Sequence, residues 1–246
     1  MNFEIRDYRT YIGAQRLIPF RVVLKESDLL ILAEKDLSQK TLEILYTIRQ
    51  ELENYIIKNP QFLKSLKPLP FDPEAPSIIQ KMLKAGKIAG VGPMAAVAGA
   101  VAQEVGEKLI NLGFTSEVVV ENGGDIYLAL KNNATVAIWA GNSPLSGKLG
   151  LRIKKDLMPC GVCTSSGTVG HSLSLGKADA LCVIAKDTAL ADACATALGN
   201  MVNTPKDFKK LKKALKSLPQ ALGVVCILND KLFAQGKAIE FVSINV

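Results

Sequence analysis

The 246-residue chain is 48% hydrophobic and 22% charged, which is typical of a folded globular protein and excludes a largely disordered one. An uncharged run at residues 88–103 is rich in Ala and Gly and is shorter than the roughly 20 apolar residues that span a bilayer. The net charge of +7 comes largely from a lysine-rich segment at 206–216 whose apolar residues have helical spacing. These lysines are expected to form the solvated face of an amphipathic helix rather than a nucleic-acid site.

The first residues contain several charges and lack the apolar core of a signal peptide. Five cysteines are an odd number in a chain of this length, unlike the dense, even set of a disulfide-stapled secreted scaffold. We therefore expect a cytoplasmic protein with neither a membrane nor a nucleic acid as partner, and a homo-oligomer is left open.

Alternating and apolar segments within residues 3–33 predict two or three strands. A helix is expected from Gln39 to Lys58, capped by Ser38, with Leu42 and Leu45 in its apolar stripe. Five prolines between residues 60 and 76 predict a crossing segment, because proline interrupts helices. A short helix is expected next, at 77–84.

A second long helix is predicted from Pro93 to Leu112, since Pro93 suits the first helical position and Gly113 suits the stop. Its Ala-rich first half should pack closely against a sheet. Strands are expected at 117–121, 125–130, 135–140, 149–154, 161–164 and 180–185, and, after a helix at 188–201 and the lysine-rich helix, at 222–228 and 241–244.

Short connections such as 131–134 predict antiparallel hairpins. The predicted fold is therefore α+β, with a mostly antiparallel sheet and helices packed on one side. We expect a single domain over 1–246, consisting of N-terminal strands and a helix (1–60), a Pro-rich crossing segment (60–76) and a ligand-site core (90–200).

The first polar cluster, Asn122-Gly123-Gly124-Asp125, lies between two predicted strands. Asn-Gly is a strong signal for a tight hairpin turn, and a turn alone would account for the sequence. Two glycines also let backbone N–H groups approach a ligand closely, and the flanking amide and carboxylate add polar groups there. We predict that Asn122, Gly123, Gly124 and Asp125 contact a ligand.

The second cluster runs from Thr164 to His171. Thr164, Ser165, Ser166 and Gly167 offer hydroxyl and backbone donors to phosphate or carbonyl oxygens. His171 is the only histidine of the chain. A lone histidine is often structural, but with an ordinary pKa of about 6.5 it can carry a proton at neutral pH, so we predict a catalytic role.

The third cluster places Asp192 and Thr196 four residues apart within an Ala-rich helix. Side chains at this spacing share one helix face, so both oxygens can reach one hard cation such as Mg²⁺. A buried Asp is unfavourable unless it is paired, hydrogen-bonded or metal-bound. The alternative is an Asp that caps a neighbouring loop.

Cys160 and Cys163 form a single C-x-x-C pair without a second pair. A zinc site or a redox dithiol would need further support from the structure. No Gly-x-Ser-x-Gly sequence supports a serine hydrolase.

The three clusters, in this order, resemble the ApbE-like superfamily, whose best-known members are Mg²⁺-dependent FAD:protein FMN transferases. The resemblance is carried by the glycine-opened, Ala-rich helix 90–101, by Gly123 to Asp125, by Ser166-Gly167 with the following His171, and by the run from Ala191 to Leu198. That last run is similar to the family's Ala-Asp-Ala-x-x-Thr metal motif. In length, and in the segment 161–174, the chain is most similar to a short ApbE-like family.

The resemblance implies a T-fold-like architecture, Mg²⁺ on Asp192 and Thr196, and glycine clusters that hold FAD or FMN. It implies an enzyme that transfers FMN from FAD to a Ser or Thr of an acceptor protein. The chain departs from the transferases in having Ala96 where they usually have lysine, and in lacking the acidic residue and the Pro-x-Thr-Gly turn after His171. Two alternatives stay open: a sulfur-handling accessory enzyme of amino-acid (homocysteine) biosynthesis, which would use Cys163 or Cys160 as the sulfur carrier, and a non-catalytic flavin-binding module.

Overall fold

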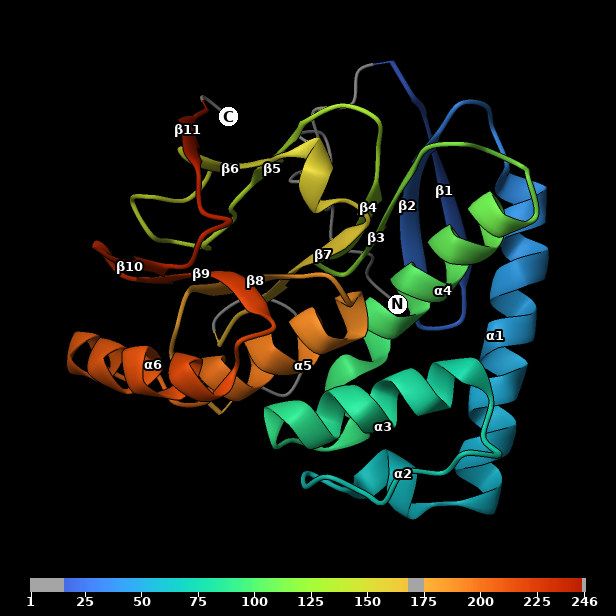
Figure 1. The fold of residues 1–246 in the computed structure, drawn as a ribbon, viewed down its shortest axis with the longest axis horizontal. Coiled ribbons are helices and arrows are strands. Elements are labelled where there is room, and N and C mark those ends of the chain that lie inside the picture. Colours follow the sequence, from blue (N-terminus) through green and yellow to red (C-terminus); the bar gives the residue numbers. More distant parts are fainter. Residues whose placement is uncertain (1–15, 168–174, 245–246) are drawn as a thin grey trace.

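The computed structural model describes residues 16–167 and 175–244, and its main feature is an eight-stranded sheet (Figure 1). Its order is β1-β2-β3-β4-β7-β8-β9-β10, and every neighbouring pair is antiparallel. The strands are β1 (Ile18–Leu24), β2 (Ser27–Ala33), β3 (Val118–Asn122), β4 (Asp125–Ala129), β7 (Cys160–Ser165), β8 (Ala180–Ala185), β9 (Ala221–Leu228) and β10 (Lys231–Gln235).

A smaller antiparallel sheet has the order β11-β6-β5. Its strands are β5 (Ala134–Ala137), β6 (Leu149–Ile153) and β11 (Phe241–Ser243). Side chains from β5 and β6 share one apolar core with Val119, Leu128 and Val162 of the large sheet. The small sheet therefore covers the face of the large sheet that points away from the helices.

The helices gather on the other face of the large sheet (Figure 1). They are α1 (Ser38–Lys58), α2 (Gln61–Lys64), α3 (Ser77–Ala89), α4 (Val97–Asn111), α5 (Thr188–Gly199) and α6 (Phe208–Ala214), with short 3-10 turns at Pro93–Ala96, Lys155–Leu157, Pro205–Asp207 and Leu215–Ser217. α4 packs against β3 and β4, and α5 packs against β7, β8 and α4. The prediction of an antiparallel sheet with helices on one side is confirmed.

The Ala-rich and Gly-rich sequence of α4 and α5 permits this close packing. A Cβ added at Gly106 of α4 would lie 2.3 Å from the Tyr127 ring of β4, and one at Gly161 of β7 would lie 2.5 Å from Thr188 of α5. Real Cβ atoms do not approach other atoms so closely, so glycine sets the distance between helix and sheet at both points.

The structure corrects several expectations. The connection 131–134 does not close a hairpin, because β4 pairs with β3 and β7 while β5 pairs with β6 in the other sheet. Leu42 of α1 is 42% exposed, whereas Leu45 is buried as predicted, and Ile44 takes the place in the apolar stripe that was expected for Leu42. Ser38 is the first residue of α1 and not its cap. Strand β10 was not predicted. Four of its five residues are exposed, so its sequence has no alternation of apolar and polar residues that would indicate a strand.

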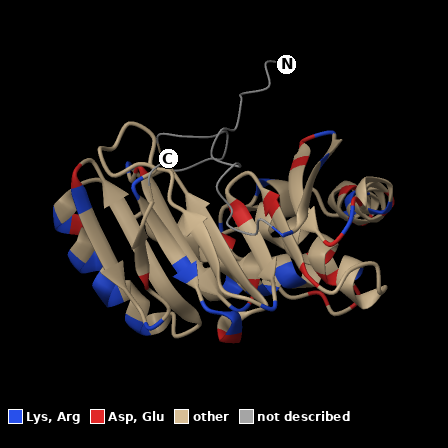
Figure 2. Cartoon of the chain, turned by 90° about the horizontal axis from the view of Figure 1, so that it is seen from above, with Lys and Arg blue, Asp and Glu red and all other residues tan. Residues whose placement is uncertain are grey.

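The lysine-rich helix was predicted correctly as an amphipathic one. Leu211 is buried, whereas the six lysines of the segment are exposed: Lys206, Lys209, Lys210, Lys212, Lys213 and Lys216. The helix that carries these lysines lies at the left edge of the cartoon in Figure 2, where its basic residues are blue.

Within the described residues, no single helix is long and apolar enough to cross a membrane. The segments Ser77–Ala89 and Pro93–Asn111 reach that length and apolar content only when they are taken together, and they are bent by 104° relative to one another.

Candidate functional site

The Gly123-Gly124 turn joins β3 to β4, as predicted. Both glycines have left-handed backbone angles, with φ of +67° and +99°, which L side chains rarely adopt. Asn122 and Asp125 lie directly opposite one another across this hairpin. The Asn122 amide donates to the Ala98 carbonyl at 3.1 Å, which anchors the hairpin to the first turn of α4.

Asp192 is anchored to the same turn of α4. Its Oδ2 accepts a hydrogen bond of 2.9 Å from the Gly99 backbone N–H, and the residue is only 9% exposed. A Cβ at Gly99 would lie 2.8 Å from the Asp192 Cβ, so a glycine is required for α5 to approach so closely. Residues 98 and 99 of α4 therefore bring the hairpin and Asp192 together.

The strand register places Asp125 on the helix-facing side of the sheet. Asp125 is paired directly with Cys163 of β7, and opposite residues of an antiparallel pair point to the same face. The Cys163 thiol donates to the Thr188 carbonyl of α5 at 3.4 Å. Thr188 is one helical turn before Asp192, so Asp125 and Asp192 both adjoin the position of Cys163.

The two carboxyls act on each other electrostatically. Burial raises the pKa of Asp192 above its usual value, against the opposing effect of the Gly99 and Ala98 backbone amides. Burial also raises the pKa of Asp125, and the charges of Asp192 and Glu121 raise it further, while a hydrogen bond from Cys163 opposes the shift. Each carboxyl makes ionisation of the other less favourable.

The helix α5 that carries Asp192 is fixed at its start by two side chains. Asp187 accepts from the Leu190 N–H at 2.8 Å. The buried Gln103 of α4 accepts from the N–H groups of Thr188 and Ala189, at 2.8 and 3.3 Å. These bonds satisfy amides that the helix leaves without internal partners.

The second predicted cluster reaches the other end of α5. A Cβ at Gly167 would lie 2.1 Å from the Gly176 carbonyl oxygen, and one at Gly176 would lie 2.0 Å from that of Gly199, the last residue of α5. Ser165 lies beside Gly199, with its Oγ 3.6 Å from a Cβ built there. The cluster at 122–125 therefore lies near the start of α5, and the described part of the cluster at 164–171 lies near its end. The third cluster, Asp192 and Thr196, is within α5.

The members of the second cluster do not all face α5. Thr164 is paired with Cys182, whose side chain belongs to the core on the opposite face, and its hydroxyl hydrogen-bonds that thiol. Ser166 is half-buried and Gly167 is exposed. His171 lies outside the described residues, so its catalytic role stays a prediction.

Thr196 lies one turn after Asp192 in α5 and is half-buried. The predicted spacing on one helix is confirmed, and the role as a metal ligand stays a prediction. Among residues 16–167 and 175–244, no group of three or more His, Cys, Asp and Glu side chains is arranged to hold a metal ion. A cation at this place would therefore rely on one or two carboxylates together with hydroxyl or carbonyl oxygens.

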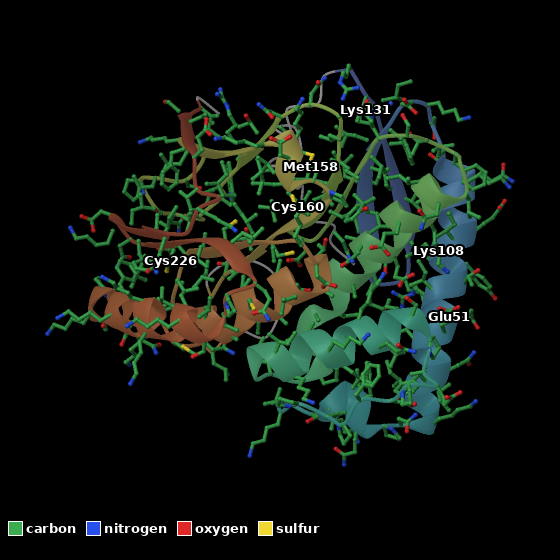
Figure 3. The ribbon with its side chains drawn as sticks, viewed as in Figure 1. Glu51, Lys108, Lys131, Met158, Cys160 and Cys226 are labelled. Carbon is green, nitrogen blue, oxygen red and sulfur yellow. The ribbon has the colours of Figure 1, made fainter. Side chains whose placement is uncertain are left out.

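All five cysteines are buried and free. Cys160 and Cys226, labelled in Figure 3, lie in different strands, β7 and β9. Cys160 and Cys163 point to opposite faces of β7, because each belongs to a different apolar core. This excludes a C-x-x-C zinc site or dithiol in the conformation observed.

Sequence reasoning missed two residues that shape this site, Gly99 and Gln103, and it considered Cys163 only as half of a C-x-x-C pair or as a sulfur carrier. The small residues of α4 indicated close packing, but nothing in the sequence specified that Asp192 is the residue which packs there. Cys163 lies opposite Asp125 because of the register between β4 and β7, and the spacing of these residues in the sequence does not determine that register.

Comparison with known proteins gives consistent results. The family described as "AbpE bacteria" matches residues 9–220. UPF0280 protein MJ1526 of Methanocaldococcus jannaschii is 42% identical over 228 residues, covering 90% of this chain and 92% of that protein. The UPF0280 protein of Methanocella arvoryzae is 39% identical over 223 residues, with coverage of 91% and 90%.

Two solved structures share the fold. The flavin transferase ApbE from Vibrio cholerae, as the H257G mutant, has a TM-score of 0.60 and 12% identity, over 90% of this chain and 98% of that one. The apo flavinyl transferase ApbE of Pseudomonas stutzeri has a TM-score of 0.56 and 14% identity, over 90% and 95%. With the family match and the relatives above, they show that the chain belongs to the UPF0280 family of the ApbE-like superfamily.

Proposed function

We propose that this protein binds a flavin nucleotide together with a divalent cation, and that it transfers FMN from FAD to a Ser or Thr hydroxyl of an acceptor protein. The observation that supports this most is the placement of Asp192. The buried carboxyl of Asp192, in an Ala-rich helix, is held by the Gly99 amide next to a glycine hairpin. The two solved structures described above, which share the fold, are flavin transferases.

The donor set fits a hard cation. Asp192 contributes a carboxylate and Thr196 a hydroxyl from the next turn of the same helix face, and Mg²⁺ prefers oxygen ligands. A bound Mg²⁺ would neutralise charge on the pyrophosphate of FAD. The cation would also offset the unfavourable burial of Asp192, whose favourable partners among the described residues are the backbone amides of Gly99 and Ala98.

The glycine loops would hold the nucleotide. Gly123 is exposed and has a left-handed backbone, so a phosphate can approach its main chain without obstruction by a side chain. Ser165 lies on the α5 side of β7, and Ser166 and Gly167 continue that strand beyond the sheet. Hydroxyl and amide groups there would donate to phosphate or flavin carbonyl oxygens.

In the proposed transfer, the acceptor hydroxyl oxygen attacks the phosphorus of the FMN half of FAD. A new phosphoester bond forms, the bond from that phosphorus to the bridging oxygen breaks, and AMP leaves with that oxygen. The hydroxyl proton passes to a base, for which neutral His171 is the candidate.

The test has two steps. FAD is first titrated into the protein in Mg²⁺ and in EDTA, and flavin fluorescence is followed; binding that requires Mg²⁺ and weakens in Asp192→Asn is expected. The protein is then incubated with FAD, Mg²⁺ and a library of Ser- and Thr-containing peptides, and AMP and flavin-labelled peptides are measured. FAD that does not bind in the first step contradicts the flavin assignment.

A flavin-binding module without transfer is the second candidate. It is favoured by Ala96, which removes the ammonium that the transferases usually carry at the start of this helix, and by the altered sequence after His171. Tight, Mg²⁺-dependent binding of FAD without release of AMP would select this candidate over the transferase.

A further inference from the structure

Asp125 is a buried acid for which the described structure supplies no complete set of partners. It is 7% exposed, and its Oδ1 has no hydrogen-bond partner among the residues that the structure describes. A buried carboxylate oxygen without a partner is strongly unfavourable. Burial therefore disfavours the ionised form of Asp125 unless a group that is added to the protein supplies a partner for this oxygen.

Asp125 lies close enough to Asp192 for the charge of Asp192 to raise its pKa. Asp125 faces the helix side of the sheet directly opposite Cys163, and Cys163 contacts the Thr188 carbonyl in the turn of α5 that precedes Asp192. Asn122, opposite Asp125 in the hairpin, is bonded to Ala98, the neighbour of the Gly99 that holds Asp192. The two carboxyls thus approach the same turn of α4 from the sheet and from α5.

The charges that act on Asp125 are all negative. They come from Asp192 and Glu121, and no Lys or Arg is among the described groups that shift Asp125. Two neighbouring buried carboxylates repel each other, and a divalent cation between them would convert this repulsion into attraction.

We infer that Asp125 is a second carboxylate ligand, beside Asp192, for the divalent cation of the proposed flavin site. The inference rests on the proposed function for the presence of a cation, and it adds a ligand from the sheet to the two from α5. Cys163, between the two acids, would position Asp125 without binding a hard cation itself, since Mg²⁺ and Mn²⁺ select oxygen ligands over thiols.

The experiment uses Mn²⁺ alone, without flavin, and compares the unmodified protein with Asp125→Asn, Asp192→Asn and Asp179→Asn. Bound Mn²⁺ is counted by electron paramagnetic resonance, and the rise in Tm on adding Mn²⁺ is measured. Asp179 is the matched control, because it is also a buried Asp, 9% exposed, but bonds the Asn229 amide at 2.6 Å. Its variant should bind Mn²⁺ normally even if it is less stable.

Asp125→Asn and Asp192→Asn should each weaken Mn²⁺ binding by about tenfold or more. Without metal, Asp125→Asn should leave Tm unchanged or raise it, because it removes one of two repelling groups. A purely structural Asp125 would instead give a lower Tm with Mn²⁺ binding intact, and that result would overturn the inference. Failure of the unmodified protein to bind Mn²⁺ would overturn it as well.

The outcomes separate the two proposals. Loss of Mn²⁺ binding in Asp192→Asn alone would leave the proposed function standing and exclude Asp125 as a ligand. Loss in both variants, with no binding of FAD, would support the two-carboxylate site and contradict the flavin function.

Discussion

The Gly99 N–H donates a hydrogen bond to Asp192 Oδ2 at 2.9 Å and joins two helices across 93 residues of sequence. The two helices are so close here that residue 99 has no room for a side chain, since a Cβ at Gly99 would lie 2.6 Å from the Thr188 carbonyl oxygen. The position of the Asp192 carboxylate therefore depends on the smallest residue of the neighbouring helix.

Gly99→Ala should consequently destabilise the protein, although Gly→Ala in an open helix stabilises by about 1 kcal/mol. Forcing a methyl group into this contact costs about 1–3 kcal/mol and moves α5 away from α4. Urea unfolding and Mn²⁺ titration measure the two effects, and both stability and Mn²⁺ affinity should fall.

Gly106→Ala is the control for this prediction. Its Cβ would lie 2.3 Å from the Tyr127 ring, so it should also lose stability, but it is about two helical turns from Gly99 and should keep Mn²⁺ affinity. A Gly99→Ala protein that binds Mn²⁺ like the unmodified one would show that Asp192 does not need this bond.

Gln103→Met should lower the free energy of unfolding by about 1–3 kcal/mol, because two N–H groups at the start of α5 lose their acceptor. Methionine keeps a similar length and an apolar body, so packing changes little. Asp187→Ala, which removes the other cap, should cost about 1 kcal/mol. Equal stability of Gln103→Met and the unmodified protein would refute the capping role.

Glu117 should make the protein sensitive to acid. Hydrogen bonds from Arg16 lower the pKa of Glu117 from 4.5 to about 2, with help from the Lys131 amide and against the effect of burial. A carboxyl whose pKa is lowered by folding stabilises the fold above its unfolded pKa. That contribution is lost as pH falls from about 4.5 toward 2.

Urea unfolding at a series of pH values tests this. Glu117→Gln should be less stable than the unmodified protein at pH 6, and the difference should shrink as pH falls toward 2. Arg16→Gln should give a smaller change of the same sign, since the Lys131 amide remains. A difference that is constant with pH would contradict the pairing.

The five thiols should be unreactive in the folded protein. Burial raises the pKa of Cys160 and Cys182 to about 12, and it raises the pKa of Cys163 well above its usual value, with help from Asp125 and Asp192. The thiolate is the reactive form, so a sulfur-carrier role for Cys160 or Cys163 is disfavoured. A thiol reagent at pH 7.5 should label none within minutes and five after unfolding; rapid labelling of Cys163 would revive that role.

Much of the fold could be predicted from local patterns. The Gly123-Gly124 hairpin and the lysine-rich helix have strong turn and amphipathic signals, whereas strand β8 and α5 are marked by apolar, almost fully buried sequences. The three polar clusters could also be recognised as candidate site residues, because their polar groups lie next to glycines or within an Ala-rich helix. Pairing between distant strands has no such signal, so the change of sheet after Lys131 was missed.

The arrangement of the site could be predicted only in part. Asp192 and Thr196 share a helix face by spacing alone, but the approach of Asp125 to Asp192 depends on the register of β4 with β7 and on the Gly99 contact. Both are long-range relationships that a single sequence does not specify.

A crystal structure of the protein with FAD and Mn²⁺ tests the central claim most directly. Anomalous scattering from Mn²⁺ should give a peak about 2.2 Å from a carboxylate oxygen of Asp192, with the FAD pyrophosphate on the opposite side of the ion and the Gly123-Gly124 turn beside it. A flavin bound elsewhere, with Asp192 still bonded only to the backbone of α4 and no metal peak beside it, would contradict the account.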